Sequence, residues 1–112
     1  MIYLLRLKKR FIMQDKNSIL SKLKELKPTY EKEGLILLGL FGSYAKDTQT
    51  QFSDIDVAYK LDYDKFSLRY KGGFAKILRI EDIKKELQVI FHKSIDLVPD
   101  TNKSILRDLI NV

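Results

Sequence analysis

The stretch LFGSYAKDTQTQFSDIDVAYK, residues 40–60, has two features that a plain core segment does not need. Gly42 and Ser43 form a small-residue turn directly after an apolar run, and Asp54 and Asp56 interrupt a second apolar run. Residues i and i+2 of a strand point to the same side, so we expect both carboxylates on one face. Two such ions next to a core repel each other and lose hydration, which is costly unless something compensates.

A divalent cation is one such compensation. Mg²⁺ prefers oxygen ligands and is usually held by one or two carboxylates together with substrate phosphates. Asp96 repeats the pattern within SIDLV, residues 94–98. If that strand lies beside the strand of Asp54 and Asp56, three carboxylates converge, enough to bind two metal ions and help a hydroxyl lose its proton. The alternative is that these acids lie on an exposed strand face, and the acids alone leave both interpretations open.

The turn at Gly42 and Ser43 favours the metal site. Glycine lets the backbone approach a ligand closely, and serine opens a helix whose free N–H groups and dipole favour phosphate. The pair is followed by ten residues, 44–53, and then by Asp-x-Asp. This spacing predicts a phosphate cradle and a metal site in one crevice, as nucleotidyl transfer requires.

The rest of the chain predicts a small α/β (α+β) domain with a mixed sheet flanked by helices. An amphipathic helix is predicted over 14–34, with Pro28 interrupting it or starting a second turn. The continuous apolar run 35–41 predicts a strand covered on both faces. The remaining predictions are strands over 54–59 and 94–98, a helix over 80–91, a short C-terminal helix, and no firm element between 60 and 80.

Composition limits the function classes. The chain of 112 residues fits a single domain, expected over 14–112 and preceded by a basic leader or misplaced start at 1–13. That leader carries four of the six net positive charges, and its apolar runs are too short to span a membrane. The rest of the chain is therefore a weak candidate for nucleic-acid binding. The lack of cysteine excludes disulfides and is compatible with the cytoplasm, where we expect the protein.

The motif resembles the signature of DNA polymerase β-like nucleotidyltransferases, in its shortest form. LFGSYAKDTQTQFSDIDVAYK looks like the minimal nucleotidyltransferase branch, in which a Gly-Ser turn precedes SDIDL. IFHKSIDLV, residues 90–98, looks like the later strand that carries the third carboxylate. The resemblance spans roughly residues 17–110 and implies the nucleotidyltransferase fold.

The resemblance also implies roles for single residues. Gly42 and Ser43 would hold the triphosphate of ATP, the substrate. Asp54, Asp56 and Asp96 would be the catalytic acids and would bind two Mg²⁺ ions. Lys46, a further nucleotide-binding residue, stands where the family usually has arginine, so it keeps the charge but loses the bidentate fork. Asp47 replaces a common glycine, which questions the turn geometry and brings a negative charge near the phosphates.

Small stand-alone members of this family resemble antitoxins that act with a helical HEPN-type ribonuclease toxin encoded nearby. The resemblance implies an Mg²⁺-dependent protein adenylyltransferase that transfers AMP from ATP to a tyrosine of that toxin, so a hetero-oligomer is expected and a membrane is not. Two alternatives stay open. One is an antitoxin that neutralises by binding alone, and the other is a small-molecule nucleotidyltransferase that works with a helical partner.

Overall fold

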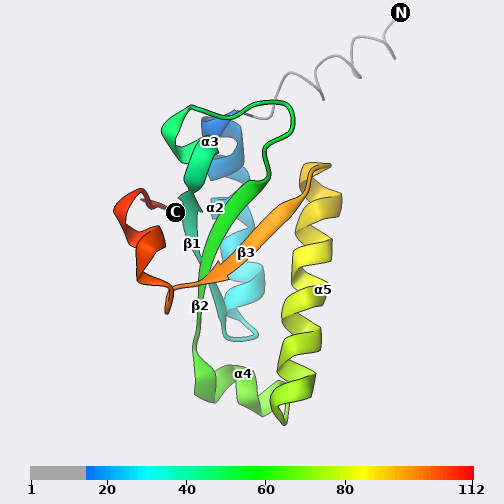
Figure 1. Ribbon diagram of the computed structural model, residues 1–112. Helices are drawn as coiled ribbons and strands as arrows, with labels where there is room; N and C mark the ends of the chain where they lie inside the picture. Colours follow the sequence, from blue (N-terminus) through cyan, green and yellow to red (C-terminus); the bar gives the residue numbers. More distant parts are fainter. Residues whose placement is uncertain (1–14) are drawn as a thin grey trace, which may run out of the picture.

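The computed structural model describes residues 15–112 (Figure 1). The predicted leader at 1–13 lies outside the described residues. The elements follow in the order α2 (Lys16–Glu31), β1 (Leu35–Phe41), α3 (Gly42–Lys46), β2 (Ile55–Leu61), α4 (Tyr63–Arg69), α5 (Gly73–Phe91), β3 (Ile95–Pro99), the 3₁₀ helix η1 (Lys103–Arg107) and β4 (Ile110–Asn111).

The strands form one mixed sheet in the order β3-β2-β1-β4. β1 pairs antiparallel with both β2 and β4, whereas β2 and β3 run parallel. The crossover from β2 to β3 passes through α4 and α5, as a parallel connection requires (Figure 1). The predicted fold class, a small mixed sheet flanked by helices, is confirmed.

α2 forms where an amphipathic pattern was predicted. It begins after Asp15, whose side chain accepts a hydrogen bond from the Ser18 N–H at 2.8 Å and so caps the first turn. Its apolar stripe, Ile19 and Leu23, is fully buried. Pro28 lies inside the helix and does not end it, so the predicted interruption at this position is wrong.

The core lies on one face of the sheet. In β2, Ile55, Val57 and Tyr59 are buried and share a face, and they belong to one apolar cluster with the buried residues of α2 and α5. β1 contributes the fully buried Leu35, Leu37 and Leu40, but Ile36 and Leu38 remain partly exposed. The prediction that β1 is covered on both faces is therefore wrong. The second face is partly accessible at Ile36, Leu38 and Asp56, whereas Ala58 on the same face of β2 is buried.

The region left without a firm prediction, 60–80, contains a complete helix and the first turns of another. α4 is capped by Asp62, whose side chain accepts from the Lys65 N–H at 3.2 Å, and it buries Phe66. α5 begins at Gly73, seven residues earlier than predicted. It ends at His92, which adopts a left-handed conformation with φ 54°.

A partly buried ionic network joins α5 to the last turn of α2 and to Glu33, which follows that helix. Arg79 of α5 donates to both carboxylate oxygens of Glu33, at 2.8 and 2.7 Å, and to Glu86 at 2.7 Å. Tyr30 of α2 donates to the other oxygen of Glu86 at 2.9 Å, and Tyr70 donates to Glu33. The hydrogen bonds from Arg79 lower the pKa of Glu33. Because each carboxylate has partners, the network tolerates its burial.

Within residues 15–112, no helix is both long enough and apolar enough to cross a membrane.

Candidate active site

The sheet register brings the three aspartates to one end of the sheet. β1 ends where the parallel strands β2 and β3 begin, so these three strand ends meet (Figure 1). Asp56 pairs directly with Asp96 in that register. Asp54 precedes Ile55, where β2 begins, so the strand predicted over 54–59 starts one residue later. The expected adjacency of the two strands is present, and all three acids point away from the core face.

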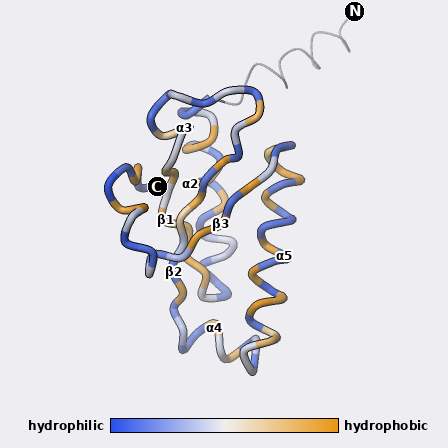
Figure 2. The backbone as a smooth tube through the Cα atoms, viewed as in Figure 1, coloured by the Kyte–Doolittle hydropathy of each residue, from blue (hydrophilic) through white to orange (hydrophobic). Residues whose placement is uncertain are grey.

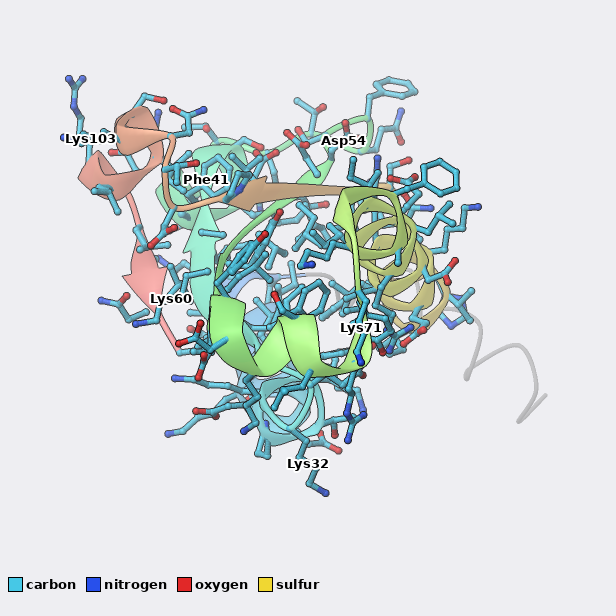
Figure 3. All side chains as sticks on the ribbon, turned by 90° about the horizontal axis from the view of Figure 1, so that it is seen from below. Lys32, Phe41, Asp54, Lys60, Lys71 and Lys103 are labelled. Atoms are coloured by element: carbon cyan, nitrogen blue, oxygen red, sulfur yellow. The ribbon has the colours of Figure 1, made fainter. Side chains whose placement is uncertain are left out.

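Gly42 joins the predicted phosphate turn to these acids. Phe41, the last residue of β1, pairs with Asp56, and Gly42 follows with φ +71° (Figure 3 labels Phe41 and Asp54). A Cβ added to Gly42 would lie 2.1 Å from Oδ2 of Asp56, closer than two atoms can approach. Only glycine therefore lets the backbone turn this tightly against the Asp56 carboxylate. The turn and the acid pair share one site, as their spacing predicted.

The three carboxylates repel one another. Burial, together with the negative charges of Asp96 and Asp54, raises the pKa of Asp56 to about 6. None of the three acids forms a salt bridge with another residue of the described range. Asp56 is half-buried, while Asp54 and Asp96 are exposed. The site thus concentrates negative charge that the described protein groups leave uncompensated.

This donor set fits a hard divalent cation. Carboxylate oxygens are the ligands that Mg²⁺ prefers, and a cation would offset the burial and the neighbouring negative charges that raise the pKa of Asp56. No three His, Cys, Asp or Glu side chains of residues 15–112 are close enough together to form a complete metal site. Asp54, Asp56 and Asp96 thus share one end of the sheet, but the structure does not gather them into the three-carboxylate metal site that the sequence predicted. Mg²⁺ commonly completes its coordination shell with water and substrate phosphates.

Ser43 is the second residue of α3, which begins at Gly42, one residue before the predicted start. α3 has five residues and no side-chain cap at its start. The Ser43 carbonyl accepts from the Thr48 N–H at 2.9 Å, whereas its hydroxyl has no hydrogen-bond partner in the described part of the chain. The first N–H groups of a helix have no partner within the helix. Phosphate binding by Gly42 and Ser43 stays a prediction that this geometry allows.

Lys46 and Asp47, the two departures from the family pattern, both form salt bridges. Lys46 Nζ lies 3.3 Å from Asp108 Oδ2, and Lys16 Nζ lies 2.9 Å from Asp47 Oδ2. Exposed pairs of this kind are worth roughly 0–1 kcal/mol, so a triphosphate could draw Lys46 away from Asp108. The negative charge of Asp47 is paired with Lys16. The predicted nucleotide contact of Lys46 is untested by this arrangement.

The backbone explains why glycine is common at the position of Asp47. Asp47 ends α3 in the left-handed conformation, with φ 59° and ψ 32°. Glycine adopts this conformation freely, and aspartate tolerates it better than most other residues. Aspartate at position 47, where the family commonly has glycine, is therefore compatible with this turn.

Sequence reasoning missed two residues beside the site, Lys16 and Asp108. Each contacts α3 from a distant part of the chain, Lys16 from the start of α2 and Asp108 from the segment before β4. Neither belongs to a motif, and only the tertiary structure brings them to α3. β4 has only two residues, too few for an alternating apolar pattern that would predict a strand from the sequence.

Comparison with known proteins agrees with this geometry. A family model described as "Polymerase beta, Nucleotidyltransferase" matches residues 21–110, which include all three aspartates and the turn at Gly42. No curated protein and no solved structure matched the chain.

Proposed function

The chain belongs to the polymerase β nucleotidyltransferase family, and from this premise we propose that it is a protein adenylyltransferase acting as an antitoxin. Nucleotidyltransferases of this family generally use a nucleoside triphosphate and a divalent metal ion. The proposed donor is ATP, and the proposed acceptor is a tyrosine of a helical HEPN-type ribonuclease encoded nearby. Chain and toxin would form a hetero-oligomer in the cytoplasm.

The observation that carries the proposal is the open face around the acids. Asp54 and Asp96 are exposed, and the helices α2 and α5 pack on the opposite face of the sheet. An acceptor hydroxyl could therefore approach Asp96 directly, without any rearrangement of the described fold. Such an open site suits an acceptor that another protein presents on its own surface.

The proposed reaction is an in-line substitution at the α-phosphorus of ATP. The tyrosine oxygen forms a bond to that phosphorus, the bond to the bridging oxygen breaks, and pyrophosphate leaves. Asp96 accepts the phenol proton, because it lies exposed at the start of the edge strand beside Asp56. Gly42 and Ser43 hold the phosphates through backbone N–H groups and the free hydroxyl.

Asp54, Asp56 and Asp96 would hold the divalent metal. When bound, that metal neutralises negative charge on the phosphates and favours ionisation of the acceptor hydroxyl. Burial and the nearby charges of Asp96 and Asp54 raise the pKa of Asp56, and this concentration of negative charge supports cation binding at this position.

The modification would inactivate a ribonuclease by electrostatics and bulk. An AMP group adds a negative charge and a large substituent to a tyrosine. If that tyrosine lies where RNA must bind, the added charge repels the phosphate backbone. Transfer of AMP by this chain would then be sufficient to neutralise the toxin.

The test is intact mass spectrometry of the neighbouring gene product after incubation with ATP, Mg²⁺ and this chain. We expect the mass to rise by one or more AMP units with the wild type, and to stay unchanged with the double variant Asp54→Asn/Asp56→Asn. Asp64→Asn is the matched control, because Asp64 is exposed on α4 and far from the acids.

Each alternative gives a different result. If the double variant still neutralises the toxin without any mass gain, the chain acts by binding alone. If the toxin gains no mass with the wild type but a small molecule in the mixture becomes nucleotidylated, the acceptor is that small molecule.

A further inference from the structure

The position of Asp54 depends on the segments on either side of it. Asp54 precedes β2, and no hydrogen bond within residues 15–112 involves it. On its C-terminal side, the Ile55 N–H donates to the Ser94 carbonyl at 3.0 Å. On its N-terminal side lies the segment 47–53, which we call the α3–β2 loop. The contacts that hold this loop therefore also place the Asp54 carboxylate.

Apolar packing does not hold the α3–β2 loop. Its sequence, DTQTQFS, contains one apolar residue, Phe52, and that side chain is 83% exposed. Figure 2 shows the chain between α3 and β2 as mostly hydrophilic. Exposed backbone without apolar packing opens readily. The shape of this loop must therefore come from hydrogen bonds.

Three hydrogen bonds close a β-turn over residues 50–53. The Ser53 N–H donates to the Thr50 carbonyl at 3.1 Å, as in a β-turn. The Thr50 N–H donates to Ser53 Oγ at 2.9 Å, and the Phe52 N–H donates to Thr50 Oγ1 at 3.2 Å. These bonds order the 50–53 turn internally, but they do not attach it to the rest of the fold.

Lys93 attaches the 50–53 turn to the segment that leads into β3. Its Nζ donates to the carbonyl of Gln51, a corner residue of the turn, at 2.9 Å. Lys93 follows His92, which ends α5, and Figure 1 shows the α3–β2 loop passing this end of α5. Lys93 forms no salt bridge within the described chain, so the Gln51 carbonyl is the one partner of its ammonium group there.

We propose that Lys93 is a positioning residue for the candidate active site. It ties the 50–53 turn to the start of β3, so that Asp54 is held beside Asp56 and Asp96. Asp96 lies three residues after Lys93, so this lysine links the segments that carry the first and the third acid. A ligand that is fixed before the metal arrives loses less conformational freedom on binding. The inference rests on the proposed metal role of Asp54, and Lys93 acts through the turn without touching metal or substrate.

Chymotrypsin cleavage of the metal-free chain tests the tether itself. Chymotrypsin cleaves after aromatic residues, and Phe52 is exposed at the second corner of the turn. Lys93→Met keeps the unbranched aliphatic chain and loses the donor, so we expect cleavage after Phe52 to become about fivefold faster, the effect of one net hydrogen bond. Lys93→Arg keeps a donor and should be cleaved at nearly the wild-type rate.

Lys22→Met is the matched control, because it removes the same charge from a lysine that pairs only with Glu25. Its cleavage after Phe52 should match that of the wild type. Mass spectrometry identifies the cleavage site, and circular dichroism checks that all variants stay folded.

Mn²⁺ titration of the same variants, read by electron paramagnetic resonance of the free ion, tests the consequence for Asp54. Removing a positive charge near three carboxylates would by itself strengthen cation binding. We expect the opposite, because a metal ligand that is no longer oriented costs affinity. Mn²⁺ binding should weaken by at least about threefold in Lys93→Met and recover in Lys93→Arg. The sign of the change thus separates positioning from charge alone.

The failures are distinguishable. Cleavage after Phe52 that is no faster in Lys93→Met than in Lys22→Met would overturn the tether, as would an equal loss in Lys93→Arg. If the wild type binds Mn²⁺ and Lys93→Met binds it as tightly or more tightly, Lys93 does not position Asp54 and the proposed metal site stands. A wild type that binds no Mn²⁺ would overturn the proposed metal site and this inference with it.

Discussion

At the scale of single residues, the site depends on how closely Gly42 approaches Asp56. The structure places the Gly-Ser turn beside the Asp-x-Asp pair, as their spacing predicted, and the roles of these residues stay predictions. It gave no indication that a Cβ on Gly42 would lie only 2.1 Å from the Asp56 carboxylate, because that distance depends on the pairing of β1 with β2.

Gly42→Ala tests this approach. The new methyl group must displace the Asp56 carboxylate or the turn, and φ +71° is unfavourable for alanine by about 1–2 kcal/mol. We expect nucleotide-dependent activity to fall to background while a folded protein with a lower melting temperature remains.

Gly73→Ala is the matched control for that substitution. Gly73 begins α5, and no atom lies within 4 Å of an added Cβ. Alanine there should stabilise the protein slightly, by about 0.4–1 kcal/mol, and leave activity unchanged. Wild-type activity in Gly42→Ala would show that the close approach has no role.

Asp47 offers a second prediction at this scale. Asp47→Gly removes the salt bridge to Lys16, worth about 0–1 kcal/mol, but also removes the left-handed strain. The two effects oppose, so we expect stability near that of the wild type. Asp47→Ala loses the bridge and keeps the strain, and urea denaturation should find it less stable than Asp47→Gly by about 1–2 kcal/mol. Equal stability of these two variants would contradict the strain at this position.

At the scale of elements, the sequence predicted those whose local pattern agrees with their burial. α2 and the three longer strands were predicted because their apolar spacing matches the faces they bury. The first turns of α5 were missed because Phe74, Ile77 and Leu78 are exposed apolar residues that obscure the amphipathic pattern. α4 was missed although Asp62 caps its start, because a helix of seven residues is too short to show a clear helical spacing of apolar residues.

The packing of α5 against α2 gives a prediction at this scale. Arg79→Met leaves Glu33 and Glu86 without their main partner, and losing hydrogen bonds between partly buried charged groups costs about 1.5–3 kcal/mol. Arg79→Met/Glu33→Met should be more stable than the single variant, because it removes the unpaired charge as well. Lys22→Met, which breaks only the exposed pair with Glu25, should cost less than about 1 kcal/mol. Thermal denaturation of the four proteins measures these differences.

The same network predicts how the folding stability depends on pH. Arg79 lowers the pKa of Glu33 in the folded state, so this carboxylate contributes stability that is present above its unfolded pKa of about 4.3. That stability is lost as pH falls through the folded pKa. Between pH 5 and pH 3, roughly, the wild type should lose more stability than Arg79→Met. Parallel pH profiles for the two proteins would exclude the contribution of Glu33.

At the scale of the whole molecule, two surfaces with different chemistry lie at opposite ends of the described fold. The ends of β1, β2 and β3 carry three carboxylates beside the Gly42 turn, and α4 with the start of α5 presents the exposed apolar side chains Leu68, Phe74, Ile77 and Leu78 (Figures 1 and 2). Strand pairing made the first surface predictable, since each acid interrupts an apolar run. The second was hidden, because exposed apolar residues look like core residues in a sequence.

The central claim is that Asp54 and Asp56 bind a divalent metal together with a nucleotide. Isothermal titration of ATP into the protein, with and without Mn²⁺, measures this most directly. We predict ATP binding that depends on the metal, weakened by at least about tenfold in Asp54→Asn/Asp56→Asn and unchanged in Asp64→Asn. Metal-dependent ATP binding of wild-type affinity in the double variant would contradict the claim.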